Sequence, residues 1–179
     1  SDEQLLHAVQ QAGIDAIIHQ DNSRIGKLLT LSKQRNSDLA SVHFSLSSVS
    51  FTKSALPLGT EKVTFTSGST GHPKGVCLSS EQQLNVAQSL LQATEVVKPK
   101  HLSILPFSTL LENIGGIYAP LLAGGCIVAL PQDELGFNGS HGFDLSTLLA
   151  TISRVQPNSI ILLPELLLAL VTASHQGWP

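Results

Sequence analysis

The residues from Thr66 to Gly75, with the sequence TSGSTGHPKG, carry the strongest chemical signal in the chain. Gly68 and Gly71 can adopt positive φ at little steric cost, so the loop can turn tightly and point its N–H groups at an anion. The neighbouring hydroxyl side chains add donors, and Lys74 adds a mobile positive charge of the kind that binds terminal phosphates. The stretch therefore predicts a polyphosphate site.

The order of these residues excludes the P-loop of the nucleoside triphosphatases, G-x-x-x-x-G-K-S/T, because Lys74 precedes Gly75 and no Ser or Thr follows. The stretch instead resembles the signature loop of the adenylate-forming superfamily, S/T-S-G-S/T-T-G-x-P-K-G, at every fixed position. This superfamily contains the acyl-CoA synthetases, the luciferases and the adenylation domains of peptide synthetases. A solvated Ser/Gly linker is the alternative interpretation, and the Pro-Lys-Gly end and the flanking strands argue against it.

A second stretch, residues 105–113 (LPFSTLLEN) before Gly124-Gly125, is similar to another superfamily motif, L-P-L/F-x-H-x-x-E-R/N. In those enzymes it lines the carboxylate and acyl pocket, and its E-N form is typical of long-chain acyl-CoA synthetases. Thr109 stands where the family usually has His or an aromatic residue. The resemblance makes Thr109 and Glu112 candidate substrate-binding residues, with a solvated or helix-pairing carboxylate as the alternative for Glu112. Residues 164–167 (PELL) resemble a family turn and are expected to pack.

The resemblance implies activation of a carboxylic acid by ATP to an acyl-adenylate with release of pyrophosphate, followed by thioester formation with coenzyme A. A fatty acid is the expected substrate; other acids and a carrier-protein acceptor remain open. Lys74 would be the catalytic charge that follows the pyrophosphate, and Mg²⁺ would neutralise the same phosphate oxygens. The predicted ATP-binding residues are Thr66, Ser67, Gly68, Ser69, Thr70, Gly71, Lys74 and Gly75. We assign no metal ligands, since the seven histidines show no ligand spacing.

The resemblance also predicts what the rest of such an enzyme supplies. Family members carry a downstream T-E motif, a ribose-binding aspartate and a catalytic lysine in a C-terminal domain, and the 179 residues contain no match to them. We therefore expect residues 1–179 to be a single α/β subdomain of a larger AMP-binding domain, inactive alone and completed by the C-terminal domain of its parent chain. The alternatives are a stand-alone ATP-binding or regulatory module without catalysis, and a structural α/β domain with an empty loop.

Composition narrows the class of protein. A net charge of −3, a pI near 6.1 and 13% charged residues give no indication of a nucleic-acid or anionic-membrane partner. No run of about 18 apolar residues predicts a transmembrane segment. Cys77 and Cys126 lie in apolar stretches and are expected to be reduced, buried thiols. Together these features predict a cytoplasmic protein. The resemblance, and not the composition, implies an enzyme with a small-molecule carboxylate substrate.

The elements that must position these motifs alternate along the chain. With 42% hydrophobic and 4% aromatic residues, the chain predicts an aliphatic core. The phosphate loop is expected to join two strands, and the helix after it to turn Leu84, Ala87 and Leu91 inward. Helices are predicted over 2–12, 27–33, 80–95, 109–123, 144–155 and from 164, and strands over 14–19, 39–44, 62–66, 75–78, 101–106, 126–131 and 159–164. This order predicts an α/β fold, a mainly parallel sheet with helices on both faces, as in the large N-terminal domain of an adenylate-forming enzyme.

Overall fold

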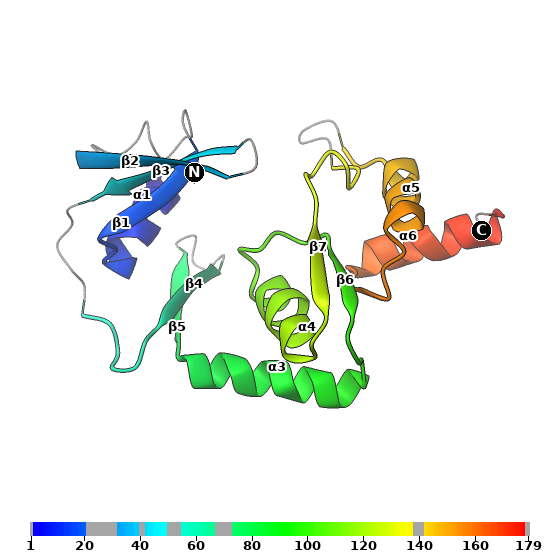
Figure 1. The fold of residues 1–179 in the computed structure, drawn as a ribbon. Helices are drawn as coiled ribbons and strands as arrows, with labels where there is room; N and C mark the ends of the chain where they lie inside the picture. The colour runs from blue at the N-terminus through cyan, green and yellow to red at the C-terminus, as the bar shows by residue number, and fades with distance from the viewer. Residues whose placement is uncertain are drawn as a thin grey trace. The chain divides into compact units, whose positions relative to one another are not determined.

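The structure is a computed structural model that describes residues 2–20, 32–39, 42–49, 55–66, 73–137 and 142–177. It divides into two compact units, Ser1–Ser79 and Ser80–Pro179. Helices and strands are mixed in both units, which confirms the α/β class (Figure 1).

The first unit begins with a helix and an antiparallel sheet. Its elements are α1 (Asp2–Ala12), β1 (Ala16–Gln20), β2 (Ser32–Leu39) and β3 (Val42–Ser48). The strand order is β1-β3-β2, and β3 pairs antiparallel with both neighbours. The helix over 2–12 is confirmed, and Gly13, whose φ is 57°, follows it in the left-handed conformation typical of helix ends. Because these strands are antiparallel, the expected parallel sheet does not extend to this unit.

The helix expected over 27–33 is wrong where the structure describes it. Ser32 and Lys33 already belong to β2, and residues 27–31 lie outside the described part of the chain. The strand β2 has the polar sequence SKQRNSDL, which has no apolar alternation to announce it. Its pairing with β3 decides its conformation, and this tertiary interaction is invisible to local propensity.

The strand expected over 39–44 is also misplaced. Leu39 ends β2, Val42 begins β3, and β3 continues beyond the predicted end through several serines to Ser48. A hydroxyl fits a buried strand when it finds a partner. Ser47 is such a case, because it is fully buried and its Oγ lies 3.0 Å from His19 Nε2.

The two strands that flank the phosphate loop are confirmed. They are β4 (Lys62–Thr66) and β5 (Lys74–Leu78), which form an antiparallel pair. Their β-branched residues favour extended backbone, and the loop turns the chain back on itself. The loop therefore joins two strands, unlike a P-loop, which leads directly into a helix.

The second unit contains the parallel sheet. Its elements are α3 (Ser80–Thr94), β6 (Lys100–Ser103), the π-helix η1 (Glu112–Tyr118), α4 (Ala119–Leu122), β7 (Cys126–Ala129), α5 (Leu145–Val155), β8 (Ser159–Ile160) and α6 (Pro164–His175). The strand order is β7-β6-β8, and both pairings are parallel. The helix expected over 109–123 is confirmed in place, but its π-helical middle was not predicted.

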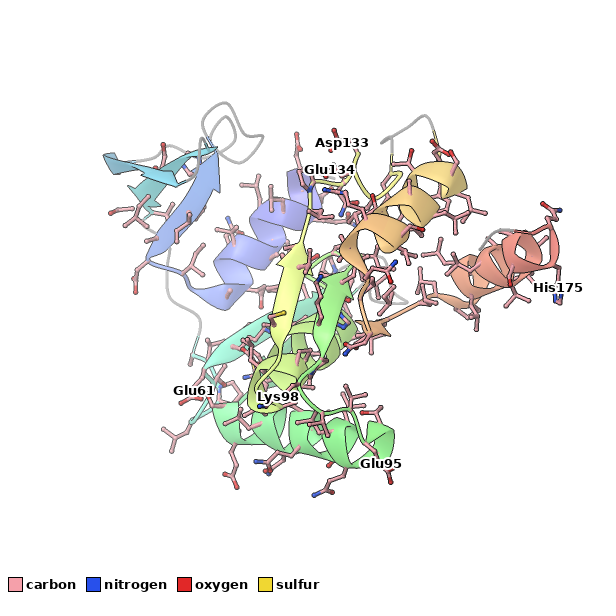
Figure 2. The ribbon with its side chains drawn as sticks, turned by 45° about the vertical axis from the view of Figure 1, so that its right-hand side comes forward. Glu61, Glu95, Lys98, Asp133, Glu134 and His175 are labelled. Carbon is pink, nitrogen blue, oxygen red and sulfur yellow. The ribbon has the colours of Figure 1, made fainter. Side chains whose placement is uncertain are left out.

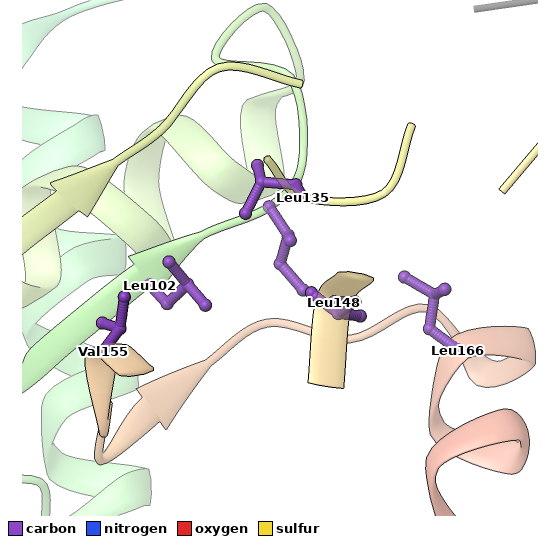
Figure 3. Close-up of a cluster of buried hydrophobic side chains, with 6 residues drawn as sticks. Leu102, Leu135, Leu148, Val155 and Leu166 are labelled. Atoms are coloured by element: carbon purple, nitrogen blue, oxygen red, sulfur yellow. The ribbon is translucent and has the colours of Figure 1, made fainter. Parts of the chain in front are cut away.

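The central strand β6 is covered on both faces. Leu102 is fully buried in a cluster with Leu148 and Val155 of α5 and Leu166 of α6 (Figure 3). Its neighbour His101 is also fully buried and points to the opposite face, where it meets η1. Successive strand residues point to opposite faces, so this alternation places helices on both sides of the sheet.

The helix α3 packs against η1 and α4 through a second cluster. Ala87 of α3 is fully buried there, and Leu91 packs against the same cluster, as predicted. Leu84 is 41% exposed, so its predicted inward position is wrong. The buried stripe of α3 runs through Gln83 and Ala87, four residues apart, and Leu84 lies beside this stripe.

Close backbone approaches connect the elements of this unit. A Cβ on Gly125 would lie 2.1 Å from the carbonyl oxygen of Pro99, so this position accepts no side chain. The amide of Cys126 donates to the same oxygen at 2.8 Å, and the Cys126 side chain is exposed. Cys77 is half-buried, so the expectation of two buried thiols is wrong. Beyond β7 lies Glu134, which is labelled in Figure 2. Its carboxylate forms an exposed ion pair with Arg154 of α5 at 2.7 Å.

Leu148 is expected to contribute strongly to the stability of the second unit. Replacing it by Ala removes a fully buried side chain and should lower the free energy of unfolding of the 179-residue chain by about 2–5 kcal/mol. Leu168→Ala is the matched control, because Leu168 is 68% exposed and its truncation should cost less than about 0.5 kcal/mol. Urea unfolding measures both values, and equal losses would contradict the assigned core.

Asp144 is expected to make the stability of α5 depend on pH. Hydrogen bonds from the side chains of Ser146 and Thr147 hold the pKa of Asp144 below its usual value. The folded state therefore favours the charged form, and the stabilisation is present above the unfolded pKa and lost as pH falls through the folded value. Asp144→Asn keeps an acceptor but cannot titrate. The stability difference between Asp144 and the Asn variant should shrink in acid, and a constant difference from pH 7 to pH 2.5 would contradict this role.

Candidate functional site

The hairpin of β4 and β5 sets the two ends of the phosphate loop. Thr66 pairs with Lys74, so the chain leaves and re-enters the sheet at one place. The Thr66 hydroxyl lies 3.4 Å from the Lys74 carbonyl oxygen, and both side chains are exposed. The other predicted ATP-binding residues of this loop, Ser67, Gly68, Ser69, Thr70 and Gly71, lie outside the described residues.

Gly75, which follows Lys74 in β5, lies where neighbouring side chains leave no room for a Cβ atom. A Cβ on Gly75 would lie 2.9 Å from Val63 Cγ1 and 3.3 Å from the ring of Phe65. Gly75 therefore lets two apolar side chains of β4 lie across β5. Lys74, Pro73 and these residues border a groove of about 450 Å³ within this unit.

The two lysines that begin β4 and β5 differ in how far they are buried. Burial lowers the pKa of Lys62, at the start of β4. Lys74 is exposed at the mouth of the loop, where its flexible side chain can reach a ligand. An exposed cation beside an exposed hydroxyl is a suitable partner for phosphate oxygens. Among the residues that the structure describes, no group of three His, Cys, Asp or Glu side chains could hold a metal ion.

The second predicted group, Thr109 and Glu112, lies where the chain enters η1. The Thr109 hydroxyl donates to the Pro106 carbonyl oxygen at 2.8 Å and lies 3.4 Å from the Glu112 amide. Thr109 is exposed, whereas Glu112 is fully buried. The solvated interpretation of Glu112 is therefore wrong.

Glu112 meets a residue that the sequence analysis missed. Its Oε1 lies 3.4 Å from His101 Nε2, and the other ring nitrogen, Nδ1, lies 2.9 Å from Ser159 Oγ of β8. We call His101, Glu112 and Ser159 the polar cluster. A histidine directly before the apolar residues Leu102 and Ile104 was the available signal, but nothing in the sequence named its partners. The structure thus brings Thr109 and Glu112 together, while the phosphate loop belongs to the other unit.

An apolar groove of about 180 Å³ lies beside the polar cluster in the second unit. Ser159 lines it together with Gly115 of η1. Its apolar walls come from α3, from the region of η1 and α4, and from the end of β8. The apolar residues that line it include Leu90, Leu91, Val96, Leu111, Ala119, Ile160 and Ile161. The groove can accept a small aliphatic group.

Comparison with known proteins identifies the family. The family model for the AMP-binding enzyme matches residues 1–178. The chain belongs to the AMP-binding enzyme family. The adenylate-forming resemblance is thereby confirmed, and with it the expected similarity to the N-terminal domain of these enzymes.

Relatives of this AMP-binding chain include large synthetases. It is 28% identical over 123 residues to the nonribosomal peptide synthetase dtxS1 of Metarhizium robertsii, covering 69% of this chain and 1% of that protein. It is 32% identical over 149 residues to the nonribosomal peptide synthetase imqB of Aspergillus flavus, covering 75% and 4%. The chain thus spans a few per cent of these relatives.

The fold is similar to that of a solved ligase. The solved structure is o-succinylbenzoate CoA synthetase from Bacillus subtilis in complex with the acyl-adenylate intermediate OSB-AMP. Its superposition on this chain has a TM-score of 0.59 at 16% sequence identity, and covers 96% of this chain and 42% of that chain. This likeness shows the fold. Among the described residues, no helix is both long and apolar enough to cross a bilayer.

Proposed function

We propose that this chain is the phosphate-binding part of an adenylate-forming ligase, which uses ATP to convert a carboxylic acid to an acyl-adenylate and pyrophosphate. The observation that carries the proposal is the register of β4 and β5, which places Thr66 and Lys74 at the two ends of the signature loop. Membership of the AMP-binding family supports it. A cytoplasmic location, with its supply of MgATP, belongs to the same proposal.

The chemistry places a clear demand on the loop. When a carboxylate oxygen attacks the α-phosphorus, the bond to the pyrophosphate oxygen breaks and negative charge accumulates on the leaving group. Donors and a cation held there stabilise the transition state more than the ground state. Lys74 is the proposed cation, with Thr66, Gly75 and the loop residues Ser67, Gly68, Ser69, Thr70 and Gly71 binding the β- and γ-phosphates. Mg²⁺ would lower the charge of the same phosphates.

The proposed substrate is an aliphatic acid, with a fatty acid and coenzyme A as the finer proposal. The aliphatic walls of the groove in the second unit support an apolar acyl group. Thr109, exposed before η1, is the proposed substrate contact. The peptide synthetase relatives favour a second candidate, adenylation of an amino acid for transfer to a carrier protein.

This chain is proposed to act with further domains of its parent protein, because it covers 42% of the solved ligase and a few per cent of the synthetases. We expect the isolated 179 residues to be inactive. Carboxylate-dependent ATP–pyrophosphate exchange by the isolated chain would contradict this expectation. The stand-alone alternative predicts instead that it binds MgATP without turnover.

Lys74→Ala in the full-length protein is expected to lower kcat/KM for MgATP roughly tenfold to a hundredfold, since the charge that follows pyrophosphate is lost. ATP–pyrophosphate exchange with a panel of fatty, aryl and amino acids measures it. Lys98→Asn is the control: it removes an exposed lysine of the second unit, and asparagine tolerates the φ of 45° found there. Unchanged exchange in the Lys74 variant would overturn the proposed role of Lys74.

A further inference from the structure

The polar cluster connects three elements of the second unit. His101 is the central residue: Nδ1 contacts Ser159 of β8 at 2.9 Å, and Nε2 lies 3.4 Å from Glu112 at the start of η1. His101 and Glu112 are both fully buried. One imidazole therefore links the sheet to the helix that follows β6.

Burial of the His101–Glu112 pair costs more free energy than an ordinary packing contact would. Both carboxylate oxygens of Glu112 and the Nε2 of His101 are buried without a hydrogen-bond partner among the described residues, so their 3.4 Å contact is electrostatic. Such groups lose their hydration on burial, and an apolar pair of similar size would avoid that loss. A role other than stability would explain why this pair occupies the interior.

The π-helix is shaped around the pair. A Cβ on Gly116 would lie 2.5 Å from Glu112 Oε1 and 2.9 Å from His101 Nε2, so any other residue there would displace both side chains. π-Helical turns are rare in proteins, and those that occur are often found at functional sites. The turn that begins at Glu112 and the missing side chain at Gly116 together make the space that the carboxylate fills.

The pair holds a segment in a position that suits ligand binding. Residues 104–111 connect the carboxyl end of β6 to η1, and Glu112 is the first residue after them. The hydroxyl of Thr109, inside this segment, accepts a hydrogen bond from the Glu112 amide and donates one to the Pro106 carbonyl oxygen. In parallel α/β sheets, ligands bind at the carboxyl ends of the strands. Ser159 gives the same histidine a contact with the neighbouring parallel strand.

We propose that His101 and Glu112 are positioning residues that fix segment 104–111 over the carboxyl end of β6 for contact with the carboxylate substrate. The proposal rests on the proposed function for the substrate contact alone. Neither side chain touches substrate, because both are fully buried. Loss of the pair would leave the phosphate loop unchanged and misplace the acid.

Glu112→Gln in the full-length protein removes the charge and keeps the size of the side chain. We expect the KM for the carboxylate to rise about tenfold, because a small misplacement near a reacting group is costly, with the KM for MgATP within about twofold of the wild type. Gly116→Ala should act in the same direction. The Gln variant preserves the test if the Ala variant fails to fold.

Thr151→Val is the control for a purely structural role. Thr151 is 5% exposed, donates to the Glu134 carbonyl oxygen at 2.7 Å and belongs to α5, on the other face of the sheet. Its substitution should destabilise the protein and leave the carboxylate KM unchanged. A carboxylate KM unchanged in Glu112→Gln, or raised equally by Thr151→Val, would overturn the proposal.

Amide hydrogen exchange separates this inference from the proposed function. Glu112→Gln should speed exchange at Thr109 and Asn113, whose amides donate to Pro106 and Thr109, without speeding exchange in α5. This readout needs no turnover. Absence of any carboxylate-dependent exchange of pyrophosphate in the wild-type protein would refute the proposed function, while unchanged amide exchange in the variant would refute the positioning role.

Discussion

Burial of β6 on both faces is the constraint on which the second unit depends. Leu102 faces α5 and α6, and His101 faces η1, so one short strand holds together two different interfaces. An apolar side chain satisfies the first interface by exclusion of water. The second contains the carboxyl group of Glu112, which must meet the His101 ring with the correct geometry. The strand therefore combines an apolar contact, which needs no exact geometry, on one face with a polar contact that needs it on the other.

The polar face of β6, where His101 meets Glu112, explains features that apolar packing alone does not. Removing one partner of a buried pair commonly costs roughly 3–5 kcal/mol, whereas replacing both by apolar residues can be neutral. The His101–Glu112 pair thus makes each member depend on the other and on Gly116, which leaves room for the carboxylate. Specific geometry, more than stability, is what such a pair supplies. This is consistent with its place beside the segment that follows β6.

The phosphate hairpin solves a different problem. A loop that binds a polyphosphate needs exposed donors, while its ends need a fixed backbone. Pairing of Thr66 with Lys74 fixes the ends, and Gly75 leaves room for the side chains of Val63 and Phe65. The charge that the proposed chemistry requires is therefore carried by a flexible side chain on a rigid strand, so that it can follow a leaving group without moving the backbone.

Local patterns in the sequence determined much of this protein. The motif with Lys74, the two strands around it and the helix that begins at Ser80 could all be predicted, because their signals lie within a few residues. The polar strand β2 and the serines of β3 could not, since their conformation depends on pairing between distant segments. Likewise, the sequence left Glu112 open between substrate binding and a solvated or helix-pairing carboxylate. Its burial against His101 depends on the packing of η1 on β6.

The sequence by itself thus determined the family and many elements of the α/β fold, because both depend on residue order and short-range periodicity. Tertiary structure decided which polar residues became buried. His101, Glu112 and Ser159 are distant along the chain, and parallel strand pairing with a π-helical turn brings them together. Burial and partner choice are properties of packed surfaces, and a local pattern of residues does not contain them.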